Sequence, residues 1–128
     1  MTKRDARLIE LAKMLYSGEA RERELVSKDI VWHVPGHNPV SGEYRGHDEY
    51  FGTMVARMGA LGRWDFTLEH VMVNGNYVVA TFHLAGERGS KHVDMAGSHI
   101  LRFDDKDQIV EGWGFGDPQD ELDEFYAA

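Results

Sequence analysis

The sequence contains no cysteine, which excludes disulfides, thiolate metal sites and cysteine nucleophiles. It also lacks an uninterrupted apolar run approaching the ~20 residues that a membrane-spanning helix needs. The first residues, Met1–Arg7, do not form the apolar core of a signal peptide and lead directly into an amphipathic pattern. We therefore expect no membrane association and a location in the reducing environment of the cytoplasm.

Positive charge is scarce as well. The chain has 14 Lys and Arg residues against 22 Asp and Glu residues, a formal net charge of −8. Such a charge repels phosphate groups, so we expect no nucleic-acid partner. A hydrophobic content of 42% with 11% aromatic residues is ordinary for a globular protein. No repeat, low-complexity segment or linker divides the sequence, which predicts one domain over residues 1–128.

The first half of the sequence has the spacing of amphipathic helices. Thr2 and Asp5 fit a capping box at the start of a helix that runs to about Tyr16 and ends at Ser17-Gly18. A short second helix is predicted over residues 19–26. A third is predicted from about residue 46 to residue 62, and its apolar stripe consists of Phe51, Met54, Val55, Met58 and Leu61.

From Trp64 onward, apolar and polar residues alternate with the period of two that is typical of strands. The pattern predicts strands near residues 64–73, 78–84, 93–103 and 109–115, in addition to one near residues 30–34. The Asn74-Gly75 dipeptide predicts a hairpin between the first two. We expect an α+β fold in which a cone-shaped, strongly curved antiparallel sheet wraps around three N-terminal helical segments. The open end of such a cone is a natural ligand entrance.

Three segments resemble the nuclear transport factor two-like superfamily: residues 32–36 (WHVPG), 39–46 (PVSGEYRG) and 109–113 (IVEGW). The chain is most similar to its SnoaL-like and ketosteroid-isomerase-like small proteins, over residues 5–126. This resemblance implies the cone-shaped fold. It leaves the chemistry open, because members include isomerases, polyketide cyclases, epoxide hydrolases, dehydratases and pure binding modules.

The resemblance to ketosteroid isomerase directs attention to two histidines. His33 matches the position of the general-base aspartate in that enzyme, and His99 matches the protonated aspartate of its oxyanion hole. Leu11 stands where its tyrosine is expected, although Tyr16 follows further along the same helix. The residues alone also single out His99, since it shares the apolar register of the strand at 93–103 and a polar ring there needs a partner. The alternative for His99 is a histidine satisfied within the core. His33 faces opposite Trp32 and Ile30, so its alternative is a place at the rim of the cavity.

Further candidates come from the last predicted strand and from large apolar side chains. Asp117 is either an acid or base, or the cap of a helix that begins at Pro118. Glu111 is a second carboxylate, predicted to bind the ligand or to pair with a cavity histidine. The residues that line a pocket, or else form plain core, are Tyr16, Trp32, Met54, Met58, Phe82 and Trp113. Since no histidine pair has the spacing of a metal site, we expect no metal and no other cofactor.

Two hypotheses of different class follow. In the first, the protein is a cofactor-free enzyme of isomerase, cyclase or dehydratase type that acts on a small apolar carbonyl compound. His33 removes a proton beside the carbonyl, and His99 stabilises the resulting oxyanion. In the second, the same cavity only binds a small hydrophobic ligand or serves as an interaction module. The resemblance also implies a homodimer formed through the outer sheet face, for which we expect Ile100, Val71 and Val73 to supply apolar surface.

Overall fold

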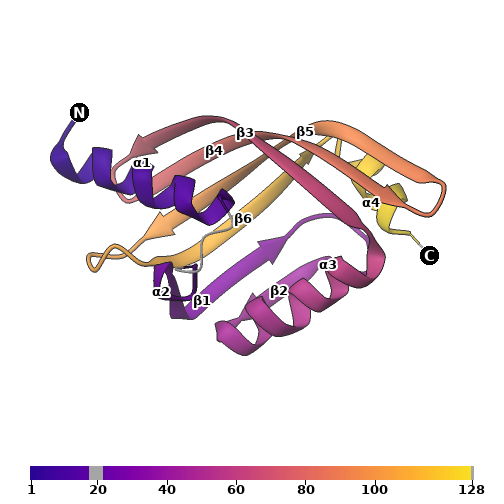
Figure 1. The fold of residues 1–128 in the computed structure, drawn as a ribbon. Helices are drawn as coiled ribbons and strands as arrows, with labels where there is room; N and C mark the ends of the chain where they lie inside the picture. Colours follow the sequence, from indigo (N-terminus) through magenta and orange to yellow (C-terminus); the bar gives the residue numbers. More distant parts are fainter. Residues whose placement is uncertain (18–21, 128) are drawn as a thin grey trace.

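The computed structural model describes residues 1–17 and 22–127, and its elements confirm the predicted α+β class. In chain order they are α1 (Lys3–Tyr16), α2 (Glu22–Leu25), β1 (Val26–Val34), β2 (Gly42–Arg45), a π-helical segment (Asp48–Met54) that continues into α3 (Val55–Leu61), β3 (Arg63–Asn74), β4 (Tyr77–Arg88), β5 (Lys91–Phe103), β6 (Ile109–Asp117) and α4 (Gln119–Tyr126). Figure 1 shows a strongly curved, unclosed sheet with helices against its concave side.

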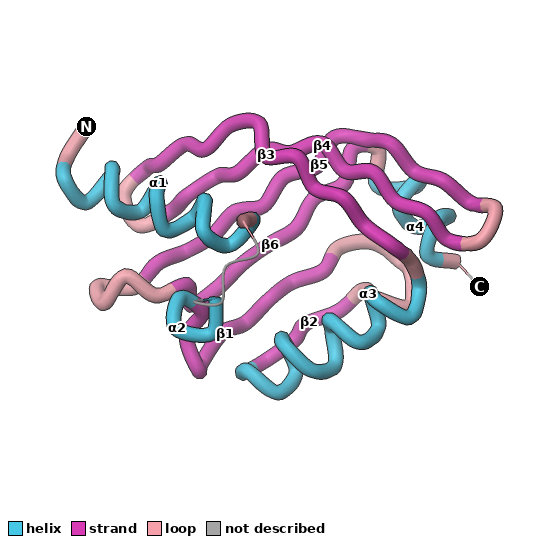
Figure 2. The backbone as a smooth tube through the Cα atoms, viewed as in Figure 1, coloured by secondary structure: helices cyan, strands magenta, loops and turns pink. Residues whose placement is uncertain are grey.

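The described strands form one sheet in the order β2-β1-β6-β5-β4-β3. Every pairing is antiparallel except that between β1 and β6, which is parallel. The predicted antiparallel sheet thus contains one parallel pair. The chain leaves β1 and returns beside it only after four further strands and α3, so the two neighbours run in the same direction. The short strand β2 also lies in a segment for which the sequence predicted no strand. Figure 2 shows how the long strands β3, β4 and β5 bend together over α1.

Helix α1 begins as its sequence predicts. The Asp5 amide donates to Thr2 Oγ1 at 3.0 Å, and the Thr2 amide donates to Asp5 Oδ2 at 3.0 Å, which completes the capping box. The predicted stop at Gly18 lies outside the described residues, as do residues 19–21 of the predicted second helix. The described part of that helix, α2, ends at Leu25, because Val26 already pairs with Ile109 as the first residue of β1.

The main core lies between α1 and the concave face of the sheet. Leu8 and Ala12 on α1 are fully buried, and they pack in one cluster with Val78, Leu101 and Phe103. Burying such side chains removes apolar area from water at about 25 cal/mol per Å². The same alternation on β5 that buries Leu101 and Phe103 points His99 towards the concave side. No helix within the described residues combines the length and apolar character required to cross a membrane.

A β-bulge in β3 changes which residues face outward. Leu68 pairs with Phe82, but His70 rather than Glu69 pairs with the next residue, Thr81. An extra residue moves every following side chain to the opposite face. Val71 and Val73 therefore pack against the core instead of lying on the outer face. The expectation that they contribute to a dimer surface was wrong for this reason, and the homodimer itself stays a prediction.

Candidate functional site

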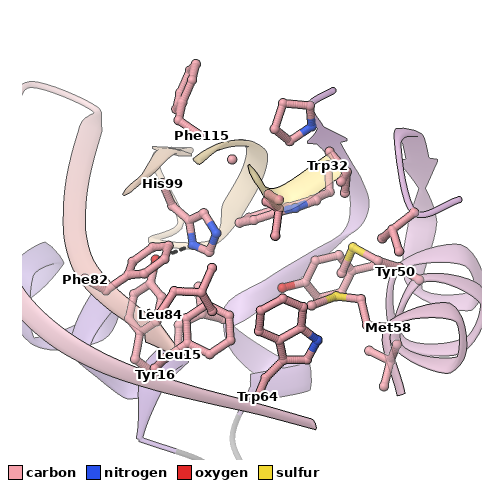
Figure 3. A pocket seen from close by; sticks show the side chains of 18 of the residues that line it. Leu15, Tyr16, Trp32, Tyr50, Met58, Trp64, Phe82, Leu84, His99 and Phe115 are labelled. Carbon is pink, nitrogen blue, oxygen red and sulfur yellow. Dashed lines mark hydrogen bonds between the residues drawn. The ribbon is translucent and has the colours of Figure 1, made fainter. Parts of the chain in front are cut away.

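A cavity of about 400 Å³ opens between the concave sheet face, α1, α3 and α4. This volume falls within the ~300–1,000 Å³ range that is typical of small-molecule sites. Its wall is predominantly apolar and aromatic, as Figure 3 shows. The predicted site residues that line it are Tyr16, Trp32, Met54, Met58, Phe82 and His99. They come from α1, β1, the π-helical segment, α3, β4 and β5, and the curvature of the sheet brings them together.

His99 projects into this cavity among three aromatic side chains (Figure 3). Its ring centroid lies 4.7 Å from that of Phe82, 5.0 Å from that of Trp32 and 5.7 Å from that of Tyr16. Desolvation disfavours a charged ring, and burial lowers the pKa of His99 to about 3. The imidazole is therefore neutral at physiological pH and acquires a proton only in strong acid.

The hydroxyl group of Tyr16 determines which ring nitrogen of His99 carries the proton. Tyr16 Oη lies 2.8 Å from His99 Nδ1, and burial raises the pKa of Tyr16, so the phenol keeps its proton. Among the described residues this hydroxyl has no other hydrogen-bond partner. It is satisfied as a donor only if Nδ1 accepts. The proton of the neutral ring then sits on Nε2, which makes no hydrogen bond within the described chain and is free to donate to a ligand.

Two further polar groups border the cavity. The ring of Tyr50 directs its hydroxyl into the open space, where it meets no hydrogen-bond partner among the described residues (Figure 3). Glu22, on α2, is the second of these lining residues and carries a carboxyl group. Burial raises the pKa of Glu22, and burial together with the charge of Glu22 raises the pKa of Tyr50. The cavity thus combines an apolar wall with a few polar groups of distinct chemistry.

The tyrosine that contacts His99 is Tyr16, although the family resemblance led to position 11, which is a leucine. Leu11 packs against the main core as a partly buried side chain. The resemblance to ketosteroid isomerase placed the expected tyrosine by its distance in sequence from Gly18, and this distance led to Leu11. Gly18 itself lies outside the described residues. The contact between Tyr16 and His99 joins residues 83 positions apart. It depends on how α1 crosses the sheet, which no local pattern reveals.

His33 does not line the cavity, so its predicted role as the cavity base is wrong. It follows Trp32 on β1, and successive strand residues point to opposite faces. On the outer face, His33 Nε2 lies 2.8 Å from Glu111 Oε2, and its ring stacks on Trp113 at 5.3 Å. The hydrogen bond from His33, assisted by Arg102, lowers the pKa of Glu111. Glu111 and Trp113 consequently belong to a surface cluster and were also misplaced by the ligand-binding prediction.

Asp117 ends β6 on the surface and does not line the cavity either. The alternative that it caps the following helix is also wrong. Helix α4 begins at Gln119, and the residue at its N-cap position is Pro118, which provides no side-chain hydrogen bond. In the described part of the chain, no group of three or more His, Asp or Glu side chains is arranged to hold a metal ion.

Two glycines on β6 leave space for neighbouring rings at the cavity wall because they carry no side chain. A Cβ atom on Gly112 would collide with the ring of Trp32. Gly114 faces the ring of His99 and borders the cavity directly. Glycine therefore serves two purposes on this strand, since Gly112 accommodates Trp32 and Gly114 leaves space beside His99.

Sequence reasoning missed Glu22 and Tyr50. Glu22 belongs to a short charged segment, Glu22–Leu25, whose residues give no apolar stripe to orient them. Tyr50 stands next to Phe51 on the predicted third helix, and only Phe51 fitted the expected stripe. Tyr50 is buried together with Met54 on the π-helical segment Asp48–Met54. The two residues are four positions apart and share a face even on a regular helix, so the spacing of Tyr50, Met54 and Met58 was a signal that could have identified Tyr50.

The comparisons with known proteins agree with this architecture. The family model of the SnoaL-like domain matches residues 20–112. No curated protein matches the chain in sequence. A Xanthomonas campestris protein of unknown function with a cystatin-like fold is similar in structure, with a TM-score of 0.82 and 26% identity over 94% of this chain and 98% of that one.

Two structures with named activities share the fold at lower identity. One is a putative SnoaL-like polyketide cyclase from Jannaschia sp. CCS1, with a TM-score of 0.80 and 16% identity over 100% of this chain and 97% of that one. The other is an LEH-like epoxide hydrolase from M. tuberculosis, with a TM-score of 0.66 and 16% identity over 96% of this chain and 91% of that one. At this identity the likeness concerns the fold alone.

Proposed function

The chain belongs to the SnoaL-like domain family, and on that premise we propose that it is a cofactor-free enzyme acting on a small, mostly apolar carbonyl compound. The reaction begins with removal of a proton from the carbon beside the carbonyl group. Return of the proton to another carbon, attack of the enolate on a second carbonyl, or loss of a leaving group would then give isomerisation, cyclisation or dehydration. All three share the enolate as their first product.

The observation that carries this proposal is the neutral His99 backed by Tyr16 in an apolar cavity. His99 Nδ1 accepts a hydrogen bond from the Tyr16 hydroxyl, so the proton on His99 Nε2 can be donated to a ligand oxygen. A donor aimed at developing negative charge is worth more in a site of low dielectric than in water, and it needs no reorganisation during the reaction. With a pKa of about 3, His99 remains a neutral donor over the whole physiological range.

The shape of the cavity defines the class of substrate. A volume of about 400 Å³ with a largely aromatic wall suits a one- or two-ring molecule without formal charge. Solved structures of this fold include a putative polyketide cyclase and an LEH-like epoxide hydrolase, which supports an enzymatic role for the fold. A ketone with an apolar body and acidic protons beside the carbonyl is the simplest probe.

The proposed function can be tested with two compounds, 2-tetralone and 2-naphthol. 2-Tetralone enolises readily, and 2-naphthol is a flat phenol whose oxygen occupies the position of the enol oxygen. In D₂O at pH 7, the protein is expected to accelerate deuterium incorporation beside the carbonyl of 2-tetralone, measured by NMR, and to bind 2-naphthol, measured by its fluorescence. Binding of 2-naphthol without accelerated exchange would contradict the enzyme and support the ligand-binding module. If the protein neither accelerates exchange into 2-tetralone nor binds 2-naphthol, it has no site for aromatic carbonyl compounds of this size.

A further inference from the structure

Glu22 is the one acidic residue among the described residues that line the cavity. Removal of a proton from carbon requires a base, and the histidine that the sequence suggested for this role, His33, lies on the outer face with Glu111. Asp117 is exposed at the end of β6. The reacting centre therefore has an oxyanion donor in His99 but needs a proton acceptor from another residue.

The other ionisable groups of the cavity are unsuited to accept a proton. His99 holds a proton too weakly, because burial lowers its pKa to about 3. Tyr16 and Tyr50 remain protonated, since burial raises the pKa of each phenol. A base is most effective when its pKa lies near the working pH. Among the side chains that line the cavity, the carboxylate of Glu22 best meets this condition.

The surroundings of Glu22 strengthen it as a base. Glu22 is the first residue of α2, which leads directly into β1 (Figure 1), and it is one of the residues that line the cavity. Desolvation raises the pKa of Glu22, and the neighbouring Arg23 offsets only part of this effect. The negative charge of Glu22 contributes to the raised pKa of Tyr50, whose hydroxyl points into the cavity. Glu22 and Tyr50 thus both line the cavity, and the charge of Glu22 acts on the Tyr50 hydroxyl.

From this geometry we infer that Glu22 is the catalytic base of the reaction, an inference that rests on the proposed function. The carboxylate of Glu22 takes the proton from the carbon beside the carbonyl group. The electron pair of the broken C–H bond forms the C=C bond of the enolate, and the carbonyl π electrons move to the oxygen, which accepts the Nε2–H of His99. The protonated Glu22 then returns its proton, or exchanges it with solvent in D₂O.

The test compares Glu22→Gln with Glu22→Asp and with Glu10→Gln. Glutamine preserves the size of the side chain but cannot accept the proton, so deuterium incorporation into 2-tetralone should fall by about 100- to 10,000-fold. The affinity for 2-naphthol should change by less than about three-fold, since the phenol oxygen contacts His99. Glu22→Asp keeps a carboxylate and should exceed the rate of Glu22→Gln at least ten-fold. Glu10→Gln removes a charge from a side chain that is 72% exposed on α1 and should exchange at the wild-type rate.

The outcomes separate this inference from the proposed function. If wild-type protein exchanges 2-tetralone and a His99 variant is impaired, but Glu22→Gln retains the wild-type rate, the function stands and Glu22 is not the base. An Asp variant no faster than the Gln variant would also overturn the inference. If wild-type protein neither binds 2-naphthol nor exchanges 2-tetralone, the proposed function itself fails. Circular dichroism and thermal unfolding of each variant establish that the fold is intact in these comparisons.

Discussion

His99→Leu is expected to slow deuterium exchange into 2-tetralone by at least about 100-fold. Leucine fills most of the volume between Phe82 and Trp32, so the apolar wall persists while the hydrogen-bond donor is lost. The substitution also leaves the Tyr16 hydroxyl without its partner at 2.8 Å, which should lower the free energy of unfolding by about 1–3 kcal/mol. The exchange rate is measured by NMR, and the affinity for 2-naphthol by fluorescence, at pH 7.

The matched control is His33→Leu, the same substitution on the outer face of β1. His33 contacts Glu111 and Trp113 and does not line the cavity, so the exchange rate and the affinity for 2-naphthol should stay within about two-fold of wild type. The reverse pattern, with a slow His33 variant and an unaffected His99 variant, would reinstate the base that the sequence suggested and refute the site described by the structure.

Gly112→Ala is expected to cause the largest loss of stability among conservative changes at the site. The added methyl group would collide with the buried ring of Trp32, which is 5% exposed and packed against Tyr50 and His99. Overpacking of a well-filled core costs about 1–3 kcal/mol and sometimes more. Movement of the Trp32 ring would also narrow the cavity, so 2-naphthol should bind less tightly. Urea denaturation gives the free energy of unfolding.

Gly59→Ala provides the control for this substitution. Gly59 lies on the exposed side of α3, and a Cβ atom there meets no atom within 4 Å. Alanine is the better helix former, so this variant should gain about 0.5–1 kcal/mol. Equal stability of the Gly112 and Gly59 variants would mean that Trp32 is not held over β6 as the structure shows.

Local patterns predicted much of the fold. The Thr2–Asp5 capping box and the alternation of β4 and β5 depend only on neighbours in sequence, and both are present. The hairpin at Gly75 also follows from local chemistry, because Gly75 adopts a φ of 61° between β3 and β4. These elements were predictable because their energetic causes act over a few residues.

The candidate site was only partly predictable, since it depends on contacts between distant elements. The alternation of β1 requires Trp32 and His33 to face opposite sides, and the buried position of Trp32 assigns the outer face to His33. The resemblance to ketosteroid isomerase nevertheless placed His33 at the base. The Tyr16–His99 contact depends on the path of α1 across the sheet, and the inward turn of Val71 depends on the bulge in β3.

Long-range ¹H–¹⁵N NMR of His99 tests most directly whether this ring is a neutral donor that meets the ligand. Because its pKa is lowered to about 3, the ring should stay neutral from pH 5 to pH 8, with Nε2 protonated and Nδ1 unprotonated. Addition of 2-naphthol should shift the Nε2–H signal downfield as the phenol oxygen accepts its hydrogen bond. A ring that titrates between pH 6 and pH 7 as a free imidazole does, or an Nε2–H signal that 2-naphthol does not move, would contradict the account.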